Sequence, residues 1–221
     1  MSTPARKRDL YQSIARVAQA LASGNRLQLL EFMAQGERSV ETLAAMAGVT
    51  VANASQHLQA LRRAGLVTSR KDGQRVYYRV AGDDVVRLHD GLRAVAESRL
   101  AEVRQLVSEF LGGRRALEAV PADELLARAK KGLVTVLDVR PPEEYDAGHV
   151  RGAVNVPMSR LEGYLAKLPK KLEIVAYCRG PYCLMSFEAV AMLRKRGWKA
   201  SRLEGGFPEW KAAGLPVESS G

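Results

Sequence analysis

The sequence predicts a mainly helical domain followed by an α/β domain with a largely parallel sheet. Two observations support this division. The 221 residues exceed the roughly 100–150 residues of one typical domain. Apolar residues first recur at helical spacing and later gather in short β-branched runs that alternate with helical segments. We expect the first domain at residues 1–112, a linker at 113–117 and the second domain at 118–221.

Four helices are expected in the first half. Apolar residues spaced three and four apart predict helices over about residues 10–23, 25–36, 40–47 and 50–65. Gly24 suits the end of the first helix and Asn25 the start of the second, while Ser39 and Thr50 can cap the third and fourth. The glycine turn at Gly48 between two short helices is typical of a helix-turn-helix.

A hairpin is expected next. Segments 66–71 and 74–80 are rich in strand-forming residues, and they flank Asp72-Gly73, a dipeptide that favours a type I′ turn. A helix-turn-helix followed by a hairpin is a winged helix. In such a domain the second helix of the motif can enter the major groove of DNA, and the hairpin, or wing, can reach phosphates or the minor groove.

The positive charge is concentrated in this region. Residues 50–82 hold six basic residues and one acid, in a chain whose net charge is +10. Such a stretch attracts polyanions. The side chains expected to contact double-stranded DNA are Asn53, Ser55, Gln56, His57, Gln59, Arg62, Arg63, Arg70, Lys71, Arg75 and Arg79. The alternatives are a solvated basic surface and, for His57, a role in helix packing.

A long last helix is predicted over residues 84–111. Its apolar stripe is too long for one small domain to bury, so we expect it to pack with the first helix in a homodimer. A two-fold dimer matches a palindromic operator. The alternative is that this helix packs on the second domain.

Three segments of the first half carry a combined pattern: ALASGNRLQLLEFM, SVETLAAMAGVTVANASQHLQALRRAGLV and RKDGQRVYYRVA. They resemble the ArsR-type winged-helix repressors over about the first 110 residues. The resemblance implies a dimeric, ligand-responsive transcriptional regulator. Metal-sensing members use cysteines on the third helix or His, Asp and Glu sets on the last. Here the third helix has no cysteine and the last has a single histidine, His89, so we expect no metal site.

Strands and helices alternate in the second half. Strands are predicted over residues 134–139, 154–156, 174–177 and 201–203, and helices from residues 120–123 onward and over 184–196. The β-branched run 134–139 is typical of a strand buried on both faces.

The segment IVAYCRGPYCLMS combines the end of a strand, a loop and the start of a helix. Ligands of open α/β sheets bind just beyond the carboxyl ends of the strands. Backbone N–H groups of the loop and the helix N-terminus are expected to face the first cysteine, where they would stabilise a thiolate or a persulfide. The candidate catalytic residues are Cys178, Arg179, Gly180, Tyr182 and Cys183. The alternative is a buried, inert cysteine.

Three segments in order, VTVLDVRPPEEYDAGHVRGAVNVP, IVAYCRGPYC and RLEGGFPEWKAAGLPV, resemble a single rhodanese domain over about residues 118–217. The resemblance implies that Cys178 carries sulfur as a persulfide, and no cofactor is expected. The residues that match the first motif, in a region that shapes the domain and the active-site rim, are Asp138, Arg140, Glu144 and His149. Those that match the last are Gly205, Gly206 and Trp210. Phosphatases of this fold have an arginine where this chain has Leu184, so phosphatase activity is not expected.

Cys183 departs from the sulfurtransferase pattern, in which many members have Ser, Thr or Arg. A second thiol can resolve a Cys178 persulfide into a disulfide, as in redox sensors. The alternative is that Cys183 only packs at the start of the helix.

The composition narrows the class of protein and the compartment in which we expect it. Hydrophobic residues make up 47% and charged residues 26%, as in an ordinary globular protein, and two cysteines are too few for a disulfide-stapled secreted scaffold. No apolar run approaches the ~20 residues that span a bilayer, and no signal core follows the basic N-terminus. We expect a cytoplasmic protein with no membrane partner.

These observations lead to one functional hypothesis and two alternatives. The hypothesis is a DNA-binding regulator, acting as a repressor, that senses reactive sulfur or redox state through Cys178 and Cys183. The first alternative is a thiosulfate-type sulfurtransferase tethered to a DNA-binding domain. The second is a binding module that recruits a protein or holds a thiophilic oxyanion such as arsenite, for which two thiols fall short of three. Whether the protein turns over as an enzyme stays open.

Overall fold

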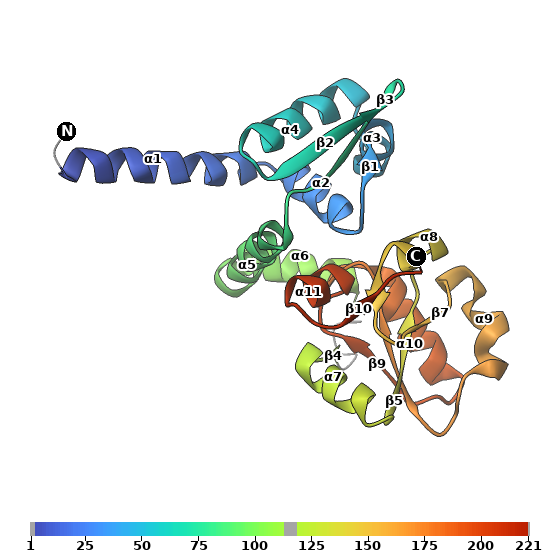
Figure 1. The fold of residues 1–221 in the computed structure, drawn as a ribbon. Helices are drawn as coiled ribbons and strands as arrows, with labels where there is room; N and C mark the ends of the chain where they lie inside the picture. The colour runs from blue at the N-terminus through green and yellow to red at the C-terminus, as the bar shows by residue number, and fades with distance from the viewer. Residues whose placement is uncertain (1–2, 113–118, 221) are drawn as a thin grey trace. The chain divides into compact units, whose positions relative to one another are not determined.

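The computed structural model describes residues 3–112 and 119–220, so the predicted linker at 113–117 lies outside the described residues. Contacts divide the chain into two units, Met1–His89 and Asp90–Gly221 (Figure 1). The division falls before the predicted boundary at residue 112, because the segment after His89 makes its contacts within the second unit. In the described parts of the chain, no helix is long and apolar enough to cross a membrane.

The first unit has the predicted winged-helix fold. Its elements are α1 (Thr3–Leu21), α2 (Gly24–Ala34), β1 (Arg38–Ser39), α3 (Val40–Ala47), α4 (Val51–Arg63), β2 (Val67–Asp72) and β3 (Arg75–Val80). The strands form an antiparallel sheet in the order β1-β3-β2, in which the two-residue strand β1 was not predicted. Leucines from α2, α3 and α4 form the core, so the opposite face of α4 is left to solvent.

Local capping follows the prediction at Ser39, Gly48 and Thr50. Ser39 and Thr50 each accept a hydrogen bond from the backbone N–H three residues further on, at 3.3 and 3.2 Å. Gly48 has the left-handed conformation (φ 64°) that ends α3. The prediction for the first boundary was wrong, because α2 begins at Gly24 with Ser23 in the N-cap position.

The hairpin turn lies one residue later than predicted. Asp72 pairs with Arg75, so the two turn residues are Gly73 and Gln74. A type I′ turn needs positive φ at both turn residues, and only Gly73 has it (φ 59°). The predicted type I′ turn at Asp72-Gly73 was therefore wrong.

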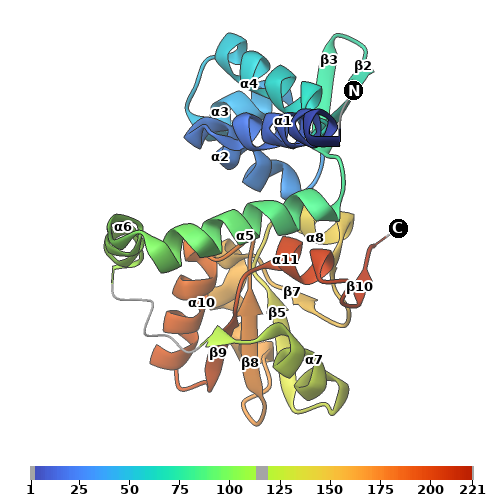
Figure 2. The same cartoon turned by 90° about the vertical axis from the view of Figure 1, so that its left-hand side faces the viewer.

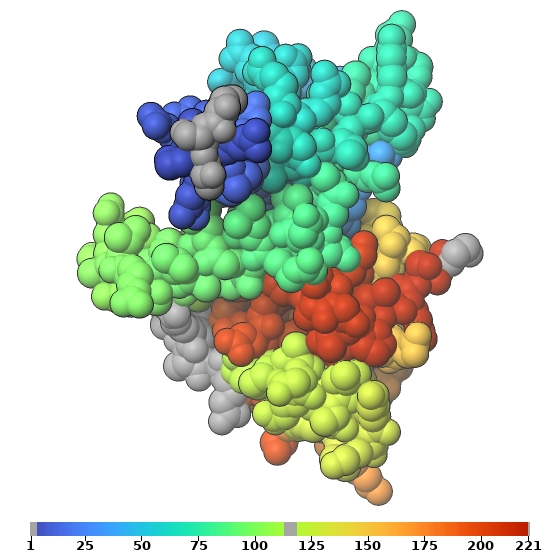
Figure 3. Space-filling view, turned by 60° about the vertical axis from the view of Figure 1, so that its left-hand side comes forward, coloured from blue at the N-terminus to red at the C-terminus, as the bar shows by residue number. Residues whose placement is uncertain are grey.

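The predicted long helix is broken into α5 (Asp83–Arg99) and α6 (Ala101–Leu111). Leu100 has extended backbone angles (φ −102°, ψ 113°), which end one helix and start the next. On α6, Val107 and Leu111 pack against Phe187, so for α6 the alternative of packing on the second unit holds. A face of α5 and α6 lies at the surface (Figure 3), with the large apolar side chains Leu88, Leu92, Val95, Leu100, Leu106 and Phe110 exposed.

The rest of the second unit has the α/β fold that the sequence predicted. Its further elements are β4 (Ala119–Val120), α7 (Ala122–Lys130), β5 (Val134–Asp138), α8 (Pro142–Ala147), β6 (His149–Val150), β7 (Val154–Asn155), the short helices η2 (Met158–Arg160), α9 (Leu161–Tyr164) and η3 (Leu165–Lys167), β8 (Glu173–Tyr177), α10 (Leu184–Lys195), β9 (Ala200–Leu203), α11 (Phe207–Ala212) and β10 (Val217–Glu218). The five-stranded sheet, in the order β4-β9-β8-β5-β7, is parallel throughout, as predicted.

Helices cover both faces of this sheet (Figure 2). Along β8, Ile174 and Ala176 face the core formed with α9 and α10, while Val175 and Tyr177 face the core formed with α7 and α11. Burial on both faces explains why the strand is apolar throughout. It also places the residue after β8 at the carboxyl edge of a central strand, where α/β proteins bind their ligands.

Candidate functional site

Helix α4 carries seven of the eleven side chains that were predicted to contact DNA. Ala54, Leu58 and Leu61 are buried in the core, and the exposed side chains are Asn53, Gln56, Gln59, Arg62 and Arg63. Ser55 and His57 are half-buried. The His57 ring lies 3.3 Å from the side-chain amide of Asn25 on α2, which is the contact expected of a packing histidine.

The basic side chains of the wing differ in how far neighbouring acidic residues compensate their charge. Arg70 is bonded to Glu37 at 2.6 and 2.8 Å and to Asp72 at 3.1 Å, and it lies 4.6 Å from the Tyr77 ring. The hydrogen bonds that Arg70 donates to Glu37 and then to Asp72 raise the pKa of Arg70. Arg79 donates to Thr68 at 3.3 Å, and Lys71 and Arg75 are exposed near the turn.

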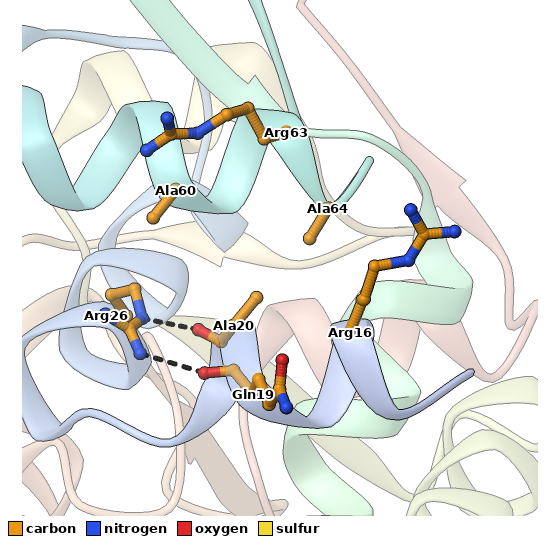
Figure 4. A pocket seen from close by; sticks show the side chains of 7 residues that line it. All are labelled: Arg16, Gln19, Ala20, Arg26, Ala60, Arg63 and Ala64. Atoms are coloured by element: carbon orange, nitrogen blue, oxygen red, sulfur yellow. Dashed lines mark hydrogen bonds between the residues drawn. The ribbon is translucent and has the colours of Figure 1, made fainter. Parts of the chain in front are cut away.

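A pocket of about 250 Å³ lies where α1, α2 and the end of α4 meet (Figure 4). Arg16, Arg26 and Arg63 line it, together with alanines of α1 and of the end of α4. Arg26 donates hydrogen bonds to the carbonyls of Ala20 (2.5 Å) and Gln19 (3.0 Å), so it caps the end of α1. The sequence reasoning missed Arg16 and Arg26, because they lie on helices that were read only for their apolar stripes.

In the second unit, Cys178 follows β8 directly and Cys183 occupies the N-cap position of α10. The structure joins them by a disulfide, with Cα atoms 6.3 Å apart. Such a separation is within the range of disulfides. Cys178 is fully buried and Cys183 is half-buried.

One of the backbone N–H groups that were expected to face Cys178 is directed elsewhere. The Cys183 N–H donates to the Gly180 carbonyl at 3.1 Å and so does not point at Cys178. The Arg179 guanidinium donates to both oxygens of Glu144, at 2.7 to 3.1 Å, so its charge is compensated. Glu144 is itself buried, which means that the pair ties the loop to α8.

Asp138 and Arg140 do not lie on a rim. Both are fully buried, and the Arg140 side chain donates to Asp138 at 2.7 to 3.1 Å and to the Gly148 carbonyl at 2.8 Å. Burial by itself lowers the pKa of Arg140, but the hydrogen bonds that it donates to Asp138 and the negative charge of Asp138 raise it overall. The Arg140 guanidinium lies 4.4 Å from the Phe207 ring. The rim placement was wrong for these two residues, because the pair is buried inside the second unit.

His149 is also structural in its contacts. It is buried, its ring stacks on Tyr145 at 3.6 Å, and its Nδ1 lies 2.9 Å from the Tyr145 carbonyl. It belongs to β6, which pairs with β10 in an antiparallel ribbon that was not predicted.

The last motif touches the cysteine loop. A Cβ on Gly206 would lie 2.4 Å from the Gly180 nitrogen and 2.6 Å from the Cys178 carbonyl oxygen. The Phe207 N–H donates to that same oxygen at 3.0 Å. Only a residue without a Cβ permits this approach, so Gly206 and Phe207 hold the backbone of Cys178.

Helix α5 supplies residues near the loop that the sequence reasoning missed. The Tyr182 hydroxyl donates to Glu97 at 2.7 Å, and Arg93 binds the same carboxylate oxygen at 2.7 Å. The spacing of Arg93 and Glu97 indicated that they share one polar face of the helix, but nothing in the local sequence linked that face to residue 182. In the described residues, no three His, Cys, Asp or Glu side chains gather as a metal site needs.

Together, the fold and site define a class of protein: a winged-helix DNA-binding unit joined to an α/β unit with a cysteine loop at the edge of its sheet. Comparisons with known proteins agree with this class. The family model for "Bacterial regulatory protein, arsR family" matches residues 23–69, and that for "Rhodanese-like domain" matches residues 121–213.

The chain is 47% identical over 213 residues to the HTH-type transcriptional regulator Rv0324 of Mycobacterium tuberculosis, covering 96% of this chain and 93% of that protein. It is 32% identical over 85 residues to a sulfurtransferase of Allochromatium vinosum, covering 38% of this chain and 78% of that protein. A solved homodimeric winged-helix fragment of Mb0332 from Mycobacterium bovis is 47% identical, with a TM-score of 0.42, and covers 46% of this chain and 93% of its own.

The chain belongs to the ArsR family of bacterial regulatory proteins and carries a C-terminal rhodanese-like domain. It is a DNA-binding transcriptional regulator, as the winged helix and its basic residues predicted.

Proposed function

We propose that this regulator is a homodimeric repressor that detects sulfane sulfur or oxidant through Cys178 and Cys183 and releases its operator when the two become bonded. One observation carries the proposal: Cys178 and Cys183 lie within bonding distance at the carboxyl end of a central parallel strand. A single sulfur-carrying cysteine would need no such partner.

The chemistry of sensing is a two-electron oxidation of the dithiol. The Cys178 thiolate attacks the outer sulfur of a persulfide donor, the donor S–S bond breaks, and the donor leaves as a thiolate. The Cys183 thiolate then attacks the inner sulfur of the Cys178 persulfide, which expels hydrosulfide and forms the disulfide. The two thiol protons go to the two leaving groups, so the dithiol is oxidised and the transferred sulfur is reduced to hydrogen sulfide. With peroxide, a sulfenic acid replaces the persulfide and water leaves.

DNA recognition is assigned to α4 and the wing. Asn53, Gln56 and Gln59 are polar, exposed and on the outer face of α4, as side chains that reach base edges must be. Phosphate contacts are assigned to Arg62, Arg63, Lys71, Arg75 and Arg79. Arg70 has a smaller part, because Glu37 and Asp72 already compensate it. The exposed apolar side chains of α1 and α5 support a two-fold dimer.

The test measures operator affinity of the reduced protein before and after inorganic polysulfide, with intact mass in parallel. Wild type should lose two hydrogens and bind more weakly. Cys183→Ser should instead retain one extra sulfur and keep its affinity. Cys178→Ser should form neither the disulfide nor the Cys178 persulfide, and it should also keep its affinity. If wild type becomes bonded while its DNA affinity does not move, the proposal is wrong.

A sulfurtransferase is the second candidate function. The match of residues 121–213 to the rhodanese-like model and the likeness to the Allochromatium sulfurtransferase support it. Steady-state formation of thiocyanate from thiosulfate and cyanide would support an enzyme. Labelling that stops at one sulfur per chain supports a sensor.

A further inference from the structure

Tyr182 is the neighbour of Cys183 in the chain, and its hydroxyl leaves the loop to contact helix α5. It donates to Glu97 Oε1 at 2.7 Å. Burial, and then the bond to Glu97, raises the pKa of Tyr182 to about 12, so the hydroxyl keeps its proton at neutral pH and remains the donor. Glu97 is 14% exposed, so water competes little for this hydrogen bond.

Arg93 holds the acceptor in place. Its guanidinium binds the same Glu97 oxygen at 2.7 Å, binds Asp90, and lies 5.7 Å from the centre of the Tyr182 ring. Asp90, Arg93 and Glu97 follow one another at helical spacing on α5, so one face of the helix presents a preformed receptor for the tyrosine.

The ring of Tyr182 is anchored as well. It packs with Leu184 and Val103 against a buried cluster formed by Val107, Leu111 and Phe187. The residues on both sides of Cys183 are therefore seated on α5 and α6. A change in the backbone at Cys183 must move these side chains or strain their contacts.

A second face of helix α5 carries exposed apolar side chains. Leu88, Leu92 and Val95 are exposed and lie on the opposite side from Asp90, Arg93 and Glu97, by the 3.6-residue period. The helix begins at Asp83, three residues after the last wing strand ends at Val80. One helix thus carries the contact to the cysteine loop and a proposed dimer face, and it continues the chain from the wing.

We propose that Tyr182, held by the Arg93–Glu97 pair, couples the bonding state of Cys183 to helix α5. This inference rests on the proposed function, and in place of the catalytic role expected from the sequence it assigns Tyr182 as a positioning residue, because its hydroxyl is directed at Glu97. Closing the Cys178–Cys183 bond moves residue 183, the hydroxyl of residue 182 transmits that movement to Glu97, and α5 then favours one dimer state over the other.

The test uses Tyr182→Phe in the full chain, because the variant keeps the ring and loses only the hydroxyl. Glu97→Gln is a second variant that removes the charge of the acceptor, and Tyr164→Phe on α9 is the matched control. Each reduced protein is treated with inorganic polysulfide, followed by intact mass, operator affinity, and hydrogen exchange of residues 90–99. Allosteric coupling typically changes affinity about 5- to 150-fold.

Wild type and Tyr164→Phe should show the full change in affinity and in exchange. Tyr182→Phe and Glu97→Gln should still form the disulfide, but their change in affinity should fall to less than about a third of that of wild type, with exchange at 90–99 unaltered by treatment. Full coupling in both variants overturns the inference and leaves the proposed function intact. If wild type becomes bonded without a change in affinity, the proposed function fails. In that case the hydrogen exchange of residues 90–99 tests the contact between Tyr182 and α5 separately. If this exchange is the same before and after treatment of wild type, the inference is overturned.

Discussion

Replacing Gly206 with alanine tests whether the last motif holds the cysteine loop. The new Cβ would lie 2.4 Å from the Gly180 nitrogen and 2.6 Å from both the Arg179 carbonyl carbon and the Cys178 carbonyl oxygen. All three atoms are backbone, so no flexible side chain can move aside. Overpacking of this kind costs about 1–3 kcal/mol. Loss of the 3.0 Å bond from Phe207 N–H to Cys178 adds about 1 kcal/mol.

We therefore expect Gly206→Ala to lower the free energy of unfolding by about 2–4 kcal/mol and to slow formation of the Cys178–Cys183 disulfide. Urea unfolding followed by tryptophan fluorescence measures the first effect, because both tryptophans, Trp198 and Trp210, are buried in the second unit. Gly163→Ala is the control, since nothing lies within 4 Å of a Cβ there. Equal stability and equal disulfide rates in the two variants would refute the steric argument.

Three further predictions concern DNA, pH and the buried ion pair. Lys71→Ala and Arg75→Ala should each flatten the slope of log affinity against log salt by about 0.9 per lost phosphate contact, and an equal effect of Arg70→Ala would contradict the compensation of that arginine. Burial raises the pKa of Glu209 from 4.5 to about 7. Folding therefore favours its protonated form, and the free energy of unfolding should fall by about 3 kcal/mol between pH 4.5 and 7. Glu209→Gln should remove that fall, and an identical pH profile would count against the assignment. Asp138→Asn should lower the free energy of unfolding by about 3–5 kcal/mol, because it leaves a buried arginine unpaired; a loss under about 1 kcal/mol in urea would show that the pair contributes little.

Features that depend on neighbouring residues were predictable. The caps at Ser39 and Thr50, the left-handed Gly48 and the apolar strand β8 arise from side chains within four positions of one another. The broken last helix was harder, because the apolar stripe runs on past Leu100 and the break became visible only in its backbone angles. Helix periodicity reports which residues share a face, and it does not report where a helix stops when no glycine or proline marks the end.

The cysteine loop shows both sides of this limit. Cys178 and Cys183 are five positions apart on a strand-loop-helix, so their proximity followed from local geometry. The ion pair of Arg179 did not, because its partner Glu144 is 35 positions away along the chain. The sequence also did not show that Asp138 and Arg140 are buried. Charged residues in a motif look alike whether they line a rim or support a core.

By itself the sequence determined the two folds, the exposed polar face of α4 and the position of the cysteine loop, because each is set by periodicity, turn residues and short spacings. Only the tertiary structure decided which charges are compensated, that Gly206 presses on the cysteine loop and that Tyr182 reaches Glu97. Those contacts join residues 28 and 85 positions apart, and such pairs meet only when packing of the whole unit brings their elements together.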